Sequence, residues 1–167
     1  MEIDKSSTSD ISIRIYKTRG RLELLCGDRC MREFSCITGS NPGDKEREGD
    51  RRTPIGRFRV VFKNPQSRFF LSLGLDYPRI YDANRALASE LITYDQYRSL
   101  VHDLMYGDMT DEAVQNRVWK TPLGGEIFIH GCADARRGTA GCVALDNPDM
   151  LFLYHRVPLG TPVEIVP

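Results

Sequence analysis

Apolar and polar residues alternate with a period of two along much of the chain, which is the pattern of strands that bury one face. The clearest run is Gly56 to Phe62, in which Phe58, Val60 and Phe62 fall on one face. We expect strands at residues 11–16, 21–26, 31–37, 56–62 and 68–75, and a final strand within 159–166. Residues 64–67, Asn-Pro-Gln-Ser, are expected to form a turn. The chain is therefore predicted to be mainly β.

Between residues 83 and 121 the apolar positions take the spacing of helices. Thr93 and Gln96 form a capping-box pattern that opens one helix, and Gly107 ends it. Helices are predicted at residues 93–107, 110–119 and 150–156. We interpret residues 83–121 as a helical insertion in a β framework, which either covers a sheet edge or forms the wall of a binding site.

The 167-residue chain carries 23 basic and 23 acidic residues, so no overall field favours nucleic acid or an anionic membrane. Its length fits a single domain, which we place at residues 11–167 behind a polar tail at residues 1–10. The tail lacks the apolar segment of a signal peptide, and no transmembrane segment is expected anywhere in the chain.

The most suggestive chemistry lies where His130 ends an apolar run and Cys142 follows Gly141. An imidazole beside a thiol activates it as a nucleophile, so we expect the pKa of Cys142 to lie below the ordinary value of about 8.5. Gly141 allows a tight turn in which the N–H groups of Ala140, Gly141 and Cys142 converge on a developing oxyanion. The alternative is a hairpin of core strands with a structural histidine and a buried cysteine.

The residues around this pair resemble the active-site signature of a known family. Ile-His130-Gly is followed by a loop and then by residues 139–149, Thr-Ala-Gly-Cys-Val-Ala-Leu-Asp-Asn-Pro-Asp, and two further blocks lie upstream at residues 38–58 and 70–78. The three blocks, and their order along the chain, are similar to those of the L,D-transpeptidase catalytic domain, also called YkuD. The resemblance covers most of residues 36–166 and implies the β-sandwich-like catalytic fold of that family.

The resemblance implies a cysteine-dependent acyltransferase or peptidase that acts on peptidoglycan stem peptides through a thioester and needs no cofactor. His130 would be oriented by the backbone carbonyl of Gly131 or Thr139. The reaction would be cross-linking, exchange, or hydrolysis as an L,D-carboxypeptidase or amidase. Such bacterial enzymes work in the periplasm or cell envelope, so either an export signal has been removed or the protein leaves by a route without one.

Four residues are candidates for substrate binding. Tyr77 lies at the end of the block at residues 70–78, and Arg79 directly follows that block. Arg136 and Arg137 lie in the loop before the cysteine. An arginine fork suits the carboxylates of stem peptides. For Tyr77 and Arg79 the alternative is that they only pack and solvate a bend.

Two positions depart from the family pattern. Ala140 stands where the family usually has a second histidine, and Ala144 stands where it usually has an arginine. This resembles a divergent branch that trims or detaches peptidoglycan-linked groups. We therefore expect acyl-enzyme chemistry in which hydrolysis is at least as prominent as cross-linking.

Other functions stay open at this point. A secreted antibacterial toxin could use the same chemistry on a rival's cell wall, with an immunity or secretion partner. A cysteine protease acting on proteins would share the pair, although His130 precedes Cys142 by only 12 residues and papain-like enzymes have the reverse order. A binding module without activity is the third alternative.

The five cysteines cannot all pair with one another. Cys26 and Cys30 flank an expected turn and could form a disulfide in an oxidising compartment. His130, Cys132 and Cys142 could be imagined as zinc ligands. Structural zinc needs four ligands, so no metal is expected.

Overall fold

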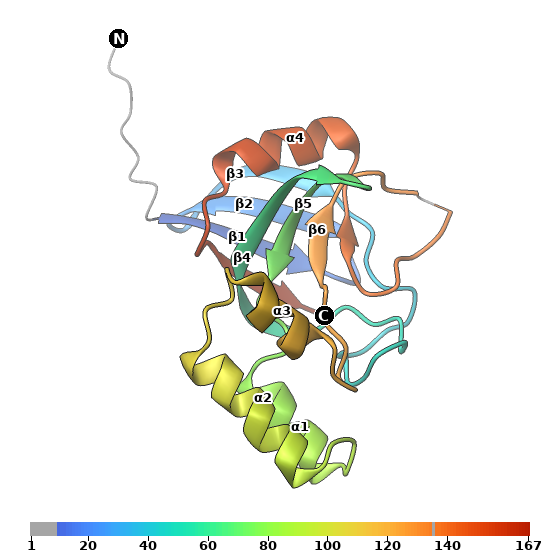
Figure 1. Ribbon diagram of the computed structural model, residues 1–167. Coiled ribbons are helices and arrows are strands. Elements are labelled where there is room, and N and C mark those ends of the chain that lie inside the picture. Colours follow the sequence, from blue (N-terminus) through green and yellow to red (C-terminus); the bar gives the residue numbers. More distant parts are fainter. Residues whose placement is uncertain (1–9, 135) are drawn as a thin grey trace.

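The computed structural model describes residues 10–134 and 136–167, and residues 1–9 of the expected polar tail lie outside this part of the chain. Within the described residues, eight strands form one sheet accompanied by four helices (Figure 1), so the prediction of a mainly β fold is confirmed. The strands are β1 (Ile11–Tyr16), β2 (Arg21–Cys26), β3 (Arg29–Ser35), β4 (Gly56–Ser67), β5 (Phe70–Leu75), β6 (Phe128–His130), β7 (Val143–Ala144) and β8 (Pro162–Val166). The helices are α1 (Ile80–Ala88), α2 (Tyr94–Tyr106), α3 (Glu112–Trp119) and α4 (Asn147–Arg156).

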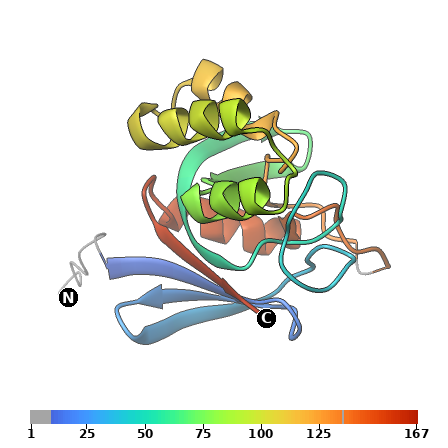
Figure 2. The ribbon, with the colours of Figure 1, turned by 90° about the horizontal axis from the view of Figure 1, so that it is seen from below.

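The sheet has the order β3-β2-β1-β8-β4-β5-β6-β7 and curls around one interior. The long strand β4 belongs to both halves, because residues 56–59 pair with β8 and residues 60–67 pair with β5. Figures 1 and 2 show the two halves facing each other, with α4 across one open end. A backbone bridge between Ile37 and Ala144 joins the segment after β3 to β7. The loops around β6 and β7 are thereby held against the loop that precedes β4.

Two hydrophobic clusters hold the fold together. The larger one lies inside the curled sheet, where strand residues such as Ile15 and Leu73 meet Met150 and Leu153 of α4. The smaller one joins α1, α2 and α3 through residues such as Leu100. Each fully buried Leu or Ile contributes about 1.5–3 kcal/mol relative to exposure. The helical insertion thus has a core of its own beside that of the sheet.

The predicted helices are observed close to their expected bounds. Thr93 Oγ1 accepts the Gln96 N–H and the Gln96 side chain accepts the Thr93 N–H, which is the predicted capping box of α2. The insertion begins earlier than expected, at Ile80, because Asp82 accepts the Arg79 N–H and stabilises the first turn of α1. None of the helices in the described ranges has the length and apolar character that a membrane span requires.

The expected turn at residues 64–67 is wrong. β4 continues through Ser67, and the chain reverses at Arg68 and Phe69. Pro65 has no N–H to donate, and the ladder with β5 shifts its register around that position, which accommodates the proline within the strand. The extension carries Phe69 to the tip of the hairpin.

Cys26 and Cys30 are not positioned for the disulfide considered above. In the ladder between β2 and β3, Cys30 lies opposite Leu25, whereas Cys26 lies opposite Arg29. Neighbouring residues of a strand face opposite sides of the sheet, so the two thiols point away from each other.

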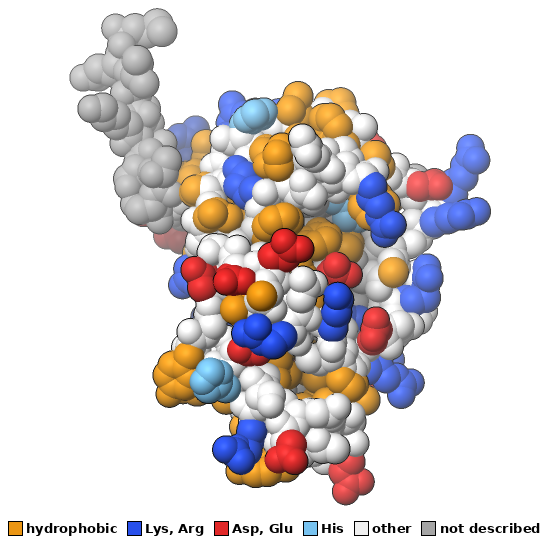
Figure 3. Space-filling view, viewed as in Figure 1, with side chains coloured by type: hydrophobic (Ala, Val, Ile, Leu, Met, Phe, Trp, Pro, Cys, Tyr) orange, Lys and Arg blue, Asp and Glu red, His pale blue; other side chains and the backbone are white. Residues whose placement is uncertain are grey.

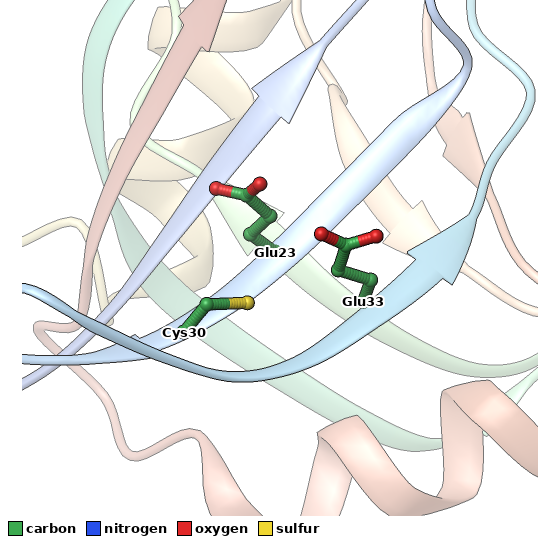
Figure 4. A group of neighbouring side chains, drawn as sticks. All are labelled: Glu23, Cys30 and Glu33. Carbon is green, nitrogen blue, oxygen red and sulfur yellow. The ribbon is translucent and has the colours of Figure 1, made fainter.

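Cys30 instead lies beside two carboxylates, Glu23 and Glu33 (Figure 4). One ligand atom from each of the three side chains lies within 4.8 Å of the others. The Arg21 guanidinium contacts Glu23 at 2.8 Å and Glu33 at 3.6 Å, so a cation of the protein already balances these charges.

The surface carries charges of both signs. Figure 3 shows basic and acidic side chains interspersed over the face seen in Figure 1, in keeping with the equal numbers of the two kinds. Hydrophobic side chains reach the surface of the helical insertion, among them Tyr94, Met105 and Tyr106 of α2.

Candidate active site

His130 and Cys142 come from neighbouring parallel strands. His130 is the last residue of β6 and pairs with Ala144 of β7. Two residues earlier, the same register places Cys142 opposite Phe128, on the face that also carries the His130 side chain. The pairing of β6 with β7 therefore brings together two residues that the intervening loop separates in sequence.

Both side chains line an open groove of about 1290 Å³. Its walls come from the loop before β4, the tip of the hairpin between β4 and β5, residues 119–128, and described residues within 132–134 and 137–144. Ala140 and Ala144 contribute only methyl groups to the lining. These two positions therefore place no polar side chain in the groove.

The four predicted substrate-binding residues have different positions. Arg137 lines the groove. Tyr77 is fully buried and its hydroxyl donates to a backbone carbonyl at 3.1 Å, so its prediction as a substrate contact is wrong. Arg79 lines a separate depression and donates to a backbone carbonyl of β4, so it too lies away from the groove. Arg136 is exposed and lies outside the groove lining of the described residues.

His130 is buried and held in one orientation. Its Nδ1 lies 2.6 Å from the Gly131 carbonyl oxygen and must donate to it, which leaves Nε2 as the basic nitrogen of the neutral ring. Phe69 stacks on the imidazole with 4.5 Å between ring centroids. Burial lowers the pKa of His130, the bond to Gly131 opposes this, and the charge of Arg68 lowers it further. At neutral pH the imidazole is therefore uncharged.

Backbone groups hold the Cys142 thiol. Sγ donates to the Glu126 carbonyl and accepts the Phe128 N–H, each at 3.4 Å, and His130 is not among its hydrogen-bond partners in the described residues. Burial raises the pKa of Cys142, and the Phe128 N–H only partly offsets this. This direction is opposite to the expected lowering of the thiol pKa.

Thr139 and Thr53 fix the turn that carries Cys142. Thr139 Oγ1 donates to the Cys142 carbonyl at 2.5 Å and accepts the Gly141 N–H at 3.1 Å. Thr53 Oγ1, from the loop before β4, donates to the Gly141 carbonyl at 2.8 Å. Gly141 has a φ of 143°, and a Cβ there would lie 2.9 Å from the Arg52 carbonyl oxygen. Only glycine fits this position without strain.

Of the three N–H groups expected to face an oxyanion, only two are free to do so in the described residues. The Gly141 N–H is bonded to Thr139 and is not free to receive an oxyanion. The N–H groups of Ala140 and Cys142 have no acceptor within residues 10–134 and 136–167. They are the candidate donors for a developing negative charge.

Asn147 holds the segment that follows β6. Its Oδ1 accepts the Cys132 N–H at 2.8 Å, and a Cβ on Gly131 would lie 2.6 Å from the same oxygen. This arrangement keeps the Gly131 carbonyl close to His130. In the part of the chain that the structure describes, His130, Cys132 and Cys142 do not form a group with ligand atoms within 4.8 Å of one another, so the zinc set is not assembled.

Four contributors to the site escape the sequence analysis, namely Thr53, Phe69, Glu126 and Asn147. Glu126 has a φ of 54°, uncommon for a residue other than glycine, and its carbonyl accepts the thiol. Phe69 was assigned to a strand, and its stacking depends on where the hairpin turns. Only Thr53 and Asn147 carried a signal, since both belong to the blocks of family resemblance.

We expect Cys142 to be alkylated by iodoacetamide with an inflection above about pH 8.5, because burial raises the pKa of its thiol. The exposed Cys132 serves as an internal control for access of the reagent. Peptide-resolved mass spectrometry after brief labelling at a series of pH values measures both in one sample. An inflection of Cys142 below about pH 8.5 would show a preformed thiolate instead.

Comparisons with known proteins identify the family and the fold of the chain. Residues 10–165 match the L,D-transpeptidase catalytic domain, YkuD. Similar solved structures include the helical cell shape determining protein Pgp2 from Campylobacter jejuni (23% identity, TM-score 0.60), Bd1075 from Bdellovibrio bacteriovorus (19%, 0.60) and an L,D-transpeptidase from Xylanimonas cellulosilytica (16%, 0.57). At these identities the similarity shows the fold alone.

The structural matches extend over most of this chain and a smaller part of the others. They cover 93%, 94% and 96% of this chain, and 46%, 48% and 62% of the three others in the same order. The chain thus spans about half the length of the first two. A sequence comparison with curated proteins gives no match.

Proposed function

The chain belongs to the L,D-transpeptidase catalytic domain family of peptidoglycan-modifying enzymes, and on that premise we propose that it cleaves stem-peptide amides through a Cys142 thioester. The observation that carries this proposal is the shared groove in which a neutral His130, with Nε2 free, faces the same side of the sheet as the thiol. The periplasm or cell envelope is the proposed location, because the substrate lies there.

In the first half-reaction, Sγ leaves the Glu126 carbonyl and passes its proton to Nε2 of His130 as it attacks the amide carbon. The N–H groups of Ala140 and Cys142 stabilise the oxyanion of the tetrahedral intermediate. His130 then returns the proton to the leaving amine, the carbon–nitrogen bond breaks, and a thioester forms. Because the imidazole is uncharged at neutral pH, it is ready to accept this proton.

In the second half-reaction, an acceptor attacks the thioester carbon and releases the thiol. His130 accepts a proton from water in hydrolysis or from an amine in exchange and cross-linking. Aminolysis depends on holding the amine in attack geometry, an advantage worth about 7–11 kcal/mol when orientation is good. Ala140 and Ala144 offer no polar side chain for that purpose, so hydrolysis is proposed to be at least as prominent as cross-linking.

Purified tetrapeptide muropeptides with an added D-amino acid provide the test. Shortened or released species, measured by mass spectrometry, are the expected products. Dimers and exchanged products alone would overturn the hydrolytic preference while keeping the acyl-enzyme. Cleavage of unrelated proteins without change in the muropeptides would favour a protease, and no turnover at all would favour a binding module.

Thr53→Val is expected to lower turnover by about 10- to 100-fold, because the loss of its bond to the Gly141 carbonyl lets the nucleophile turn move. The buried hydroxyl also accepts the Gly39 N–H at 2.8 Å, so the substitution should lower the free energy of unfolding by about 1–3 kcal/mol. Urea unfolding and turnover of the same sample measure both effects.

Thr161→Val is the matched control, since Thr161 is buried and its hydroxyl donates to a backbone carbonyl away from the groove. It should lose stability and keep turnover per folded molecule. Equal loss of turnover in the two variants would show that Thr53 acts only through stability.

A further inference from the structure

One end of the groove is built differently from the rest. We call it the Lys45 arm, and it is lined by Lys45, Glu48, Trp119, Lys120, Gly124 and Gly125. It leads to the thiol, because Gly124 and Gly125 directly precede Glu126, whose carbonyl accepts Sγ. The arm therefore lies where an extended ligand bound to Cys142 would continue.

The floor of the arm has no room for side chains. A Cβ on Gly124 would lie 3.2 Å from the Glu48 backbone and 3.3 Å from Lys45 Cε. A Cβ on Gly125 would lie 2.5 Å from Trp119. Gly124 thus lies against Lys45 and the Glu48 backbone, and Gly125 lies against Trp119.

Lys45 is a buried cation in the wall of this arm. Its residue is only 3% exposed, and Nζ donates to Asp50 and to the Arg47 carbonyl, each at 3.0 Å. An ammonium has three N–H donors, so two are engaged within the loop, and the third has no acceptor among the described residues. A lysine is almost never this buried unless its charge has partners.

The Asp50 carboxylate has partners other than Lys45. Its carboxylate also accepts the backbone N–H groups of Glu46, Arg47 and Arg52, at 2.8 to 3.1 Å. Burial raises the pKa of Asp50, but these N–H groups and Lys45 outweigh burial and leave it lowered. Asp50 therefore fixes the position of Lys45 while the loop backbone shares the negative charge.

Two further side chains of the groove lining carry donors without partners in the described residues. Trp119 Nε1 and Thr121 Oγ1 are buried and have no hydrogen-bond partner in the described residues. Trp119 is 9% exposed, and both residues line the groove. Buried donors of this kind call for an acceptor. Lys120, which is exposed beside them, adds a second positive charge.

We propose that the Lys45 arm binds a carboxylate of the peptide substrate, with the Lys45 ammonium as the main contact. The proposal rests on the proposed function of the groove and names a specificity residue for it. Glu48 and Glu126 are exposed acids of the same lining and repel an anion placed beside them, which favours a position against Lys45. A peptide has two sources of such a group, its C-terminal carboxylate and a side-chain carboxylate.

The test measures binding to the Cys142→Ala variant, so that no turnover is needed. Three probes are titrated by calorimetry: a stem tetrapeptide with both carboxylates, the same peptide amidated at its C-terminus, and the peptide amidated at its side-chain carboxylate. One amidation is expected to weaken binding about tenfold or more, because a charge-assisted hydrogen bond is lost. Which one does so identifies the source of the carboxylate.

Adding Lys45→Met should remove that difference, so that the acid and its amide bind equally. Lys45→Gln, which keeps a donor and loses the charge, serves as a second variant if the first fails to fold. Lys63→Met is the matched control, since Lys63 is also partly buried and donates to two backbone carbonyls, but lies outside the groove lining. It should keep the full preference for the acid.

Equal binding of all three peptides, absence of binding, or an unchanged preference in both Lys45 variants would overturn the proposal. The proposed function fails in a different way, namely if the unmodified protein releases no product from the same peptides. If the protein binds the acid through Lys45 without cleaving it, the carboxylate site is supported and the proposed enzymatic activity is refuted.

Discussion

Replacing Cys142 by alanine is expected to lower turnover of stem peptides by about 10⁴-fold or more while the protein stays folded. The substitution removes the atom that attacks the amide and leaves no other nucleophile in the turn held by Thr139 and Thr53. The half-buried side chain bonds only to backbone groups, so the loss of stability should stay within about 1–2 kcal/mol. Product release by mass spectrometry and thermal melts measure the two effects.

Cys132→Ala is the control for this substitution. Cys132 lines the same groove and is exposed, but its side chain makes no contact on which the mechanism depends. It should keep a substantial fraction of the activity. Normal turnover in Cys142→Ala together with its loss in Cys132→Ala would reverse the assignment of the nucleophile.

His130→Gln is expected to lower kcat/KM by about 10²- to 10⁴-fold, the usual range for loss of a general base. Glutamine has a similar length and polarity but cannot accept the thiol proton. The comparison with Cys142→Ala is informative, because residues that act as one unit do not give additive losses. The double variant should therefore be no slower than Cys142→Ala.

The pH dependence separates a base from a structural histidine. The base must be uncharged, so kcat/KM should fall as the pH drops through the pKa of His130, which lies below the ordinary 6.5. In His130→Gln this acid limb should disappear. His102→Gln and His155→Gln, at exposed positions, are matched controls that should leave the limb in place. If kcat/KM of His130→Gln still falls at low pH, the base is another group.

Sequence patterns predicted those parts of the fold that depend on local periodicity. Alternation located β1 and β2, and the capping box of Thr93 and Gln96 located α2, because both signals lie within a few residues. The turn after β4 was misplaced, since a proline normally ends a strand and only the paired strand β5 reveals the register shift around it. Such information is not local.

The candidate site divides in the same way. His130 and Cys142 stood out by residue type and by family resemblance, and the structure places them in one groove. The direction of the thiol pKa was predicted wrongly, because it depends on burial and on the Glu126 and Phe128 backbone rather than on the nearby histidine. Tyr77 was misjudged for the same reason, since nothing in its sequence surroundings shows that β4 and the insertion enclose it.

The place of β8 in the middle of the sheet has a consequence for the order of folding. Residues near the two ends of the described chain meet there, as Ile13 pairs with Val163, while Phe58 pairs with Val163 from the other side. Contacts of such long sequence separation form slowly, because most of the chain must be brought together first. Until β8 is inserted, β1 and β4 present two unpaired edges, and the loop before β4 has no fixed place against Gly141. The nucleophile turn should therefore acquire its shape among the last events of folding, which keeps a partly folded chain from acting as an enzyme.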